Sequence, residues 1–171
     1  FADNSSSSAL GADSSGNSNT WTVNNLSASA PGLATANQGM DVVTYTGTSS
    51  TQSISSLAFK PDFIWFKARS YAGSHALVDS VRGISKQLSS NLTNAESTNS
   101  AGAGPQSFNS NGFTLGNESS ATGSTNGSQT YVAYCWKANG AASSNTDGTI
   151  TSSVSANAAY GFSVVTYTGN T

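Results

Sequence analysis

Residues 42–47 read Val-Val-Thr-Tyr-Thr-Gly and alternate between two kinds of side chain. Val43 and Tyr45 fall on one face of an extended segment, while the valine at 42 and the two threonines fall on the other. β-Branched and aromatic residues at a period of two are typical of a half-buried strand. We therefore predict a β-strand over residues 41–47.

The same six residues recur unchanged at 164–169, a shift of 122 positions. The residues before both copies also agree in type, with Gly-Met-Asp at 39–41 matching Gly-Phe-Ser at 161–163. Solenoid repeats have periods of about 20 to 50 residues, so this spacing indicates a tandem domain. We predict one repeat module over residues 39–160 and the first strand of a second repeat over residues 161–171.

Two further stretches, 62–69 and 130–137, are apolar on both faces in their centres. We predict that they form the two central strands, that 62–69 is the most buried strand of the domain, and that Trp65 and Trp136 anchor the core. The residues predicted to form the core are Tyr45, Ile64, Trp65, Phe66, Val132 and Trp136.

Shorter strand patterns and turn signals fill the rest of the module. The weaker strands are expected at 53–57, 75–81, 84–88 and 149–155, with a hairpin around 109–112, where an Asn-Gly step lies between apolar residues. Many short strands separated by loops rich in Ser, Asn and Gly indicate an all-β fold, an antiparallel β-sandwich or jelly roll. Little helix is expected.

Composition excludes several classes of function. Ser, Thr, Asn and Gly make up 87 of the 171 residues, and six basic and eight acidic residues leave a net charge of −2. Six basic residues are too few to form the positively charged surface with which proteins bind nucleic acid. No apolar run reaches the roughly 18 residues that a membrane span needs, so we expect no membrane insertion. No cofactor is predicted.

The first 38 residues form a different region, rich in Ser, Ala and Asn. We expect residues 1–30 to be an extension or the end of another module, and residues 31–38 to be a linker. The chain begins at Phe1 without an initiator methionine, and we expect it to be a piece of a longer protein.

Two groups of motifs carry a resemblance to known proteins. The N-terminal group is Phe-Ala-Asp-Asn at 1–4 and Leu-Gly-Ala-Asp-Ser-Ser-Gly-Asn-Ser-Asn-Thr-Trp-Thr-Val-Asn-Asn-Leu at 10–26. The second group is Thr-Tyr-Thr-Gly at 44–47, Lys-Pro-Asp-Phe-Ile-Trp-Phe-Lys at 60–67, His-Ala-Leu-Val-Asp-Ser-Val-Arg-Gly at 75–83, Asn-Gly-Phe-Thr-Leu-Gly at 111–116 and Thr-Tyr-Val-Ala-Tyr-Cys-Trp-Lys-Ala at 130–138.

The first group resembles the end of a concanavalin-like lectin module found in structural and tail-fibre proteins of marine tailed phages. The second group resembles the β-module of unassigned function that follows it in such proteins. The resemblance implies an all-β virion or extracellular protein that assembles as a homo-oligomer. It implies no established biochemical activity.

Catalytic chemistry has little support in the sequence, and we predict no enzyme. The sole histidine, His75, lies four residues before Asp79, which places the two about 13 Å apart on a strand, beyond hydrogen-bond reach. We expect Asp79 and Arg82 to tie a loop or a domain contact together, with His75 hydrogen-bonded nearby. The eight acids show no pairing of the kind that a glycosidase needs. No catalytic residues are therefore predicted.

Metal binding is also not predicted. Asp13, Asn17 and Asn19 are oxygen donors around Gly16 and are the candidates for a calcium site, but calcium usually takes several carboxylates. An Asx turn is the favoured reading of these residues. Cys135 has no Cys or His neighbour in sequence, so we expect a buried, inert thiol.

Two functions from different classes follow. The first is a non-enzymatic structural or assembly module of a phage fibre, tail or decoration protein, whose partners are further copies of itself. The second is a glycan-binding adhesin module of a phage or bacterial surface filament. Aromatic rings in loops can stack on sugars, and Trp21, Tyr71 and Tyr160 are the candidates for such contacts with a host-surface glycan.

Overall fold

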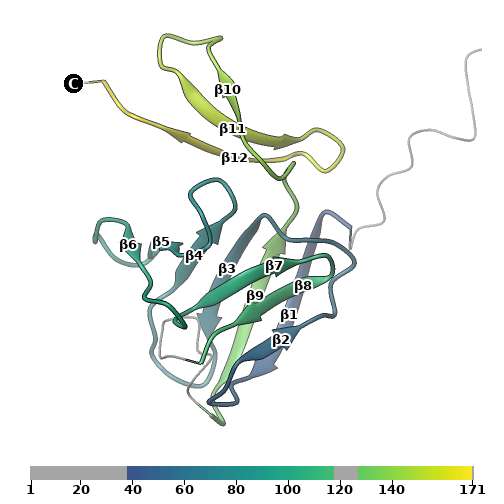
Figure 1. Ribbon diagram of the computed structural model, residues 1–171. Coiled ribbons are helices and arrows are strands. Elements are labelled where there is room, and N and C mark those ends of the chain that lie inside the picture. The colour runs from purple at the N-terminus through teal and green to yellow at the C-terminus, as the bar shows by residue number, and fades with distance from the viewer. Residues whose placement is uncertain (1–37, 118–126, 171) are drawn as a thin grey trace, which may run out of the picture. The chain divides into compact units, whose positions relative to one another are not determined.

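A computed structural model describes residues 38–117 and 127–170. All regular elements in these two stretches are β-strands, and no helix occurs in them. The strands form antiparallel sheets, so the predicted all-β, sandwich-like class is confirmed (Figure 1).

The largest sheet has four strands in the order β1-β9-β3-β4. Its strands are β1 (Met40–Thr46), β9 (Thr130–Trp136), β3 (Phe63–Ala68) and β4 (Ala76–Asp79). The strands predicted at 41–47, 62–69 and 130–137 are confirmed, and β3 and β9 are the two central neighbours, as expected.

A three-stranded sheet, in the order β2-β8-β7, lies across one face of the four-stranded sheet (Figure 1). Its strands are β2 (Gln52–Ile54), β8 (Gly112–Leu115) and β7 (Pro105–Asn109). The β7–β8 hairpin turns at 109–112, where the sequence predicts it. Gly112 is required there because a Cβ atom would lie 1.8 Å from the carbonyl oxygen of Ile54.

The core between the two sheets is built from the residues of one face of each strand. The four-stranded sheet contributes Tyr45, Ile64, Phe66, Ala68, Ala76, Val78, Tyr131, Ala133 and Cys135, and the facing side contributes Ile54, Leu57, Phe59, Phe113 and Leu115. Tyr45 stacks on Tyr131 at 5.3 Å between ring centroids and lies edge-on to Phe113. Tyr45, Ile64 and Phe66 are therefore core residues, as predicted.

The prediction for the two tryptophans is wrong. Trp65 and Trp136 are half-buried and lie on the outer face of the sheet, because side chains alternate and Ile64 and Cys135 take the inner positions. Val132 is buried but also lies outside the inner core cluster. β3 is not the most buried strand, since its residues alternate between half-buried and buried, whereas three of the four residues of β4 are buried.

The remaining strands are short. A two-stranded sheet pairs β5 (Lys86–Gln87) with β6 (Ser97–Thr98). A separate three-stranded sheet in the order β10-β11-β12 follows the sandwich along the chain, with β10 (Ser143–Asn145), β11 (Ser152–Asn157) and β12 (Phe162–Tyr167). β12 contains the second copy of the β1 sequence and pairs only with β11.

Candidate functional site

The most unusual surface in the described part of the chain lies on β12. Val165 and Tyr167 are 47% and 69% exposed, although both are large apolar or aromatic side chains. The corresponding residues of β1 are Val43, which packs against the core, and Tyr45, which is 8% exposed. The same sequence therefore has a covered face in β1 and an uncovered face in β12.

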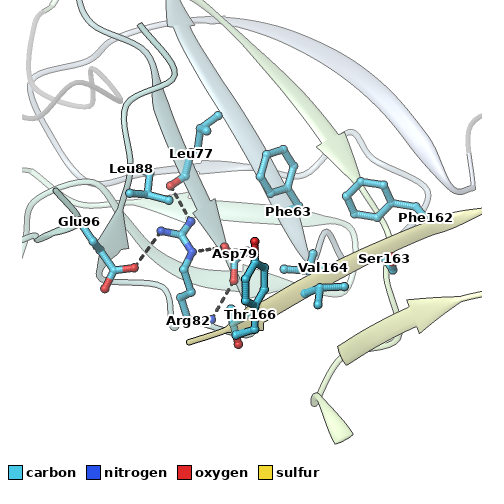
Figure 2. A pocket seen from close by; sticks show the side chains of 12 residues that line it. Phe63, Leu77, Asp79, Arg82, Leu88, Glu96, Phe162, Ser163, Val164 and Thr166 are labelled. Carbon is cyan, nitrogen blue, oxygen red and sulfur yellow. Dashed lines mark hydrogen bonds and ion pairs between the residues drawn. The ribbon is translucent and has the colours of Figure 1, made fainter. Parts of the chain in front are cut away.

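The opposite face of β12 is packed. Phe162 stacks on Trp136 with ring centroids 5.9 Å apart and lies 5.9 Å from the ring of Phe63. Figure 2 shows β12 beside a cavity of about 600 Å³, and all residues of β12 from Phe162 to Tyr167, including the exposed Val165 and Tyr167, contribute to its lining. This packing fixes which side of β12 faces the sandwich.

Arg82 organises the other wall of that cavity (Figure 2). Its Nε donates to Asp79 Oδ2 at 2.5 Å, its Nη1 donates to Glu96 Oε2 at 3.1 Å, and its Nη2 donates to the carbonyl oxygen of Leu77 at 3.0 Å. Asp79 Oδ1 also accepts the backbone N–H of Arg82 at 2.8 Å. Asp79 and Arg82 thus form an ion pair within one loop, and His75, which the sequence places near them, hydrogen-bonds instead to Trp65 and Ser90.

A second surface feature lies on the outer face of the four-stranded sheet. Its lining residues define the aromatic pocket, which has a volume of about 400 Å³ and consists of Trp65, Lys67, His75, Tyr134 and Trp136. Trp65 and Tyr134 are directly opposite each other on β3 and β9, with ring centroids 6.1 Å apart. Neighbouring outward aromatic residues thus produce one continuous aromatic wall.

Hydrogen bonds hold the polar side of the aromatic pocket in place. Trp65 Nε1 donates to His75 Nδ1 at 3.1 Å, and Ser90 Oγ lies 2.9 Å from the same nitrogen. Because an indole N–H only donates, Nδ1 must accept and a neutral His75 carries its proton on Nε2. Lys67 Nζ donates to two backbone carbonyls, those of Ala68 and Gly73. Such a wall can stack on a flat apolar ring face.

The sequence candidates for glycan contacts lie elsewhere. Tyr71 is half-buried and edge-on to Tyr131 at 6.1 Å, and the Oη atom of Tyr160 donates to Gln38 Oε1 at 3.2 Å. Neither ring lines the aromatic pocket. Trp21 lies outside the described residues. The sequence signal for the pocket was present, since strands that are apolar on both faces must place half of their aromatic residues outside a two-sheet core.

The metal candidates Asp13, Asn17 and Asn19, and the expected extension at 1–30, lie outside the described residues, as does nearly all of the expected linker at 31–38. Over residues 38–117 and 127–170, no group of three or more His, Cys, Asp or Glu side chains is placed to hold a metal ion. Within the same ranges no helix has the length and apolar character to cross a membrane.

Two titratable groups in the core are strongly perturbed. Burial raises the pKa of the Cys135 thiol to about 12, with a smaller contribution from the negative charge of Asp41. Burial also raises the pKa of Tyr45, and the neighbouring Tyr131, Cys135 and Tyr71 add to the effect. Both groups are neutral at physiological pH, and Cys135 is the buried thiol that the sequence predicts.

Comparison with curated proteins and with solved structures gave no match. The family described as "Domain of unknown function (DUF7483)" matches residues 35–171. This range includes every strand of the sandwich and of the β10-β11-β12 sheet. Because the match covers most of the chain, the protein belongs to the DUF7483 family.

Proposed function

We propose that this protein is a non-enzymatic structural module that assembles with further copies of itself in a virion, as part of a phage fibre, tail or decoration protein. The supporting observation is the repeat of the β1 sequence in β12, where Val165 and Tyr167 are exposed. Within the described residues, β12 has one edge without a partner strand and a face with large exposed apolar side chains. A further strand can pair with such an edge, and a further β-sheet can cover such a face.

The scarcity of charge supports the same function. Only 8% of the residues are charged and the net charge is −2. Facing copies with few like charges repel each other little, and Ser, Thr and Asn side chains can hydrogen-bond across the contact. The proposed location is therefore a virion or another extracellular assembly, where many copies pack together.

The oligomeric state of the 171-residue chain tests this function. Light scattering after size exclusion, with electron microscopy for symmetry, should show a homo-oligomer or a fibre whose population rises with concentration. Tyr167→Asp should weaken the assembly because it places a charge on the exposed face of β12. Ser144→Asp adds the same charge to exposed β10 and should not. A monomer at all concentrations would refute the proposal.

Glycan binding is the second candidate function, and the aromatic pocket is the observation that favours it. Tyr134 is the most exposed of its rings, with Trp65 opposite it on β3 and Trp136 two residues further along β9. Stacked aromatic rings bind the apolar face of a sugar, while His75 and Lys67 supply polar groups at the rim. A host-surface glycan would be the ligand.

A glycan array followed by titration of the best ligand tests this candidate. Tyr134→Ala should abolish binding, whereas Tyr167→Ala should leave it unchanged, because both rings are exposed but only the first lines the aromatic pocket. Loss of binding in Tyr71→Ala or Tyr160→Ala instead, with Tyr134→Ala unaffected, would move the site to the residues that the sequence predicts. An array without any bound glycan would contradict this function.

A further inference from the structure

We infer that the face of β12 formed by Val165 and Tyr167 is the docking surface for the core of a second copy of the module, continuous with this chain. In that second copy β12 takes the place of β1, and a strand equivalent to β9 pairs along its open edge. The inference rests on the proposed assembly function and names the partner of its exposed strand.

The side chains of β12 are those that the sandwich core accepts. In β1, Tyr45 stacks on Tyr131 at an interplanar angle of 19° and also contacts the edge of Phe113. Val43 packs against the same cluster. Val165 and Tyr167 have the same spacing and the same neighbours in sequence, so a second Tyr131-like and Phe113-like pair would bury them in the same way.

The unpaired edge of β12 corresponds to the edge of β1 that pairs with β9. In β1, the backbone oxygen of Gly39 and the backbone nitrogen of Gly47 each make a 2.9 Å hydrogen bond on the β9 side. Backbone direction alternates along a strand, so Val43 and Tyr45, at even spacings from these glycines, also direct their backbone groups toward β9. If β12 is the first strand of a second module, the backbone groups of Val165 and Tyr167 must likewise be free to pair with a strand equivalent to β9.

β12 meets this requirement. Its hairpin with β11 has four loop residues, ends on the pair Asn157 and Phe162, and contains Gly161 in the left-handed region at φ 65°. The turn spans residues 158–161 and is closed between Asn157 and Phe162, so the backbone groups of Phe162 point toward β11. By alternation, those of Val165 and Tyr167 point to the edge of β12 that is not paired with β11.

The packing of the other face leaves only one side for the second copy. Phe162 already stacks on Trp136 and contacts Phe63. Its counterpart in β1 is Met40, which lies on the outer face of the four-stranded sheet and is exposed. The outer face of β12 thus contacts the preceding module, and the inner face is available to the core of the next one.

The test compares the 171-residue chain with the same chain extended after Gly169 by residues 48–160 of its own sequence. In the extended chain, Tyr167 should become several-fold less reactive toward nitration, as measured by peptide mass spectrometry. Tyr167→Ala should lower the folding equilibrium constant of the second copy on the order of 100-fold or more. Tyr45→Ala is the matched control and should have the same effect on the first copy.

Four results would overturn the inference. The extension could remain unfolded, Tyr167 could stay as reactive as in the 171-residue chain, or Tyr167→Ala could leave the second copy equally stable. Protection of Tyr167 in the 171-residue chain at high concentration, with none added by the extension, would assign β12 to a separate chain and also overturn it. The nitration comparison is made at a concentration at which neither chain oligomerises, so a 171-residue chain that stays monomeric at all concentrations refutes the assembly function alone.

Discussion

Tyr45 and Tyr167 occupy the same position in two identical strands, yet Tyr45 is 8% exposed and Tyr167 is 69% exposed. The difference has a structural cause. β1 is paired with β9 and covered by the β2-β8-β7 sheet, whereas β12 is paired only with β11. The same sequence therefore lies in two environments within one chain, so the exposed Tyr167 is a control for the buried Tyr45.

The first prediction uses that pair in the 171-residue chain. Tyr45→Ala removes a ring that stacks on Tyr131 and should lower the free energy of unfolding by about 3–5 kcal/mol. Tyr167→Ala removes an exposed ring and should change it by no more than about 0.5 kcal/mol. Urea unfolding followed by circular dichroism measures both. Equal losses would mean that the two strands have equivalent environments.

The second prediction concerns the close approach at Gly112. Gly112→Ala places a methyl group 1.8 Å from the carbonyl oxygen of Ile54, so the β8 and β2 backbones must separate. We expect a loss of about 2–3 kcal/mol or more. Gly148→Ala is the matched control, because no atom lies within 4 Å of its added Cβ. Thermal unfolding of both variants checks the prediction, which fails if Gly112→Ala is as stable as the control.

The third prediction concerns the ion pair between Arg82 and Asp79. Arg82→Met keeps the aliphatic stem but leaves the carboxylate of Asp79, whose side chain is 3% exposed, without its cation. The loss should be about 2–4 kcal/mol because a buried charge remains uncompensated. Lys86→Met removes an exposed contact to Thr98 and should cost less than about 0.5 kcal/mol. Similar values for the two variants would show that the Arg82 network contributes no stability.

The fourth prediction is a loss of stability in alkali. Cys135 has a folded pKa of about 12, above its ordinary value of 9.0, so its contribution is complete below pH 9 and is lost as the pH rises toward 12. The slope should be about 1.4 kcal/mol per pH unit for each such group. Tyr45, whose pKa is also raised, adds to the loss above pH 10.

Unfolding midpoints measured between pH 8 and pH 11 test whether stability falls as the pH rises. Cys135→Ala removes one of the two groups and should make the decline of the midpoint shallower than in the unchanged chain. In the unchanged protein, a thiol reagent should label Cys135 only as fast as the chain unfolds, because the side chain is buried. A midpoint that rises with pH, or rapid labelling at neutral pH, would contradict the burial of these two groups.

The sequence predicts the strands of the four-stranded sheet well because their patterns are long and their apolar residues have a clear period. The alternation in 41–47 correctly assigns Val43 and Tyr45 to one face. The stretches 62–69 and 130–137 were less informative about burial. Both of their faces are apolar, so nothing in the local pattern shows which face meets the second sheet.

That ambiguity explains why Trp65 and Trp136 were expected in the core and are found on the outer face. It also explains why the aromatic pocket was not predicted, since its rings come from two strands that are far apart in sequence. The pairing of Trp65 with Tyr134 depends on the register between β3 and β9. Register is set by the whole fold, and no local pattern contains it.

Hydrogen exchange at the backbone amides of Val165 and Tyr167 is the most direct test of the claim that β12 is the first strand of a further module. In the 171-residue chain both amides point to an open edge and should exchange nearly as fast as in an unfolded chain. In the chain extended by residues 48–160, they should become as protected as those of Val43 and Tyr45, which pair with β9. Unchanged fast exchange at both amides in a folded extended chain would contradict the claim.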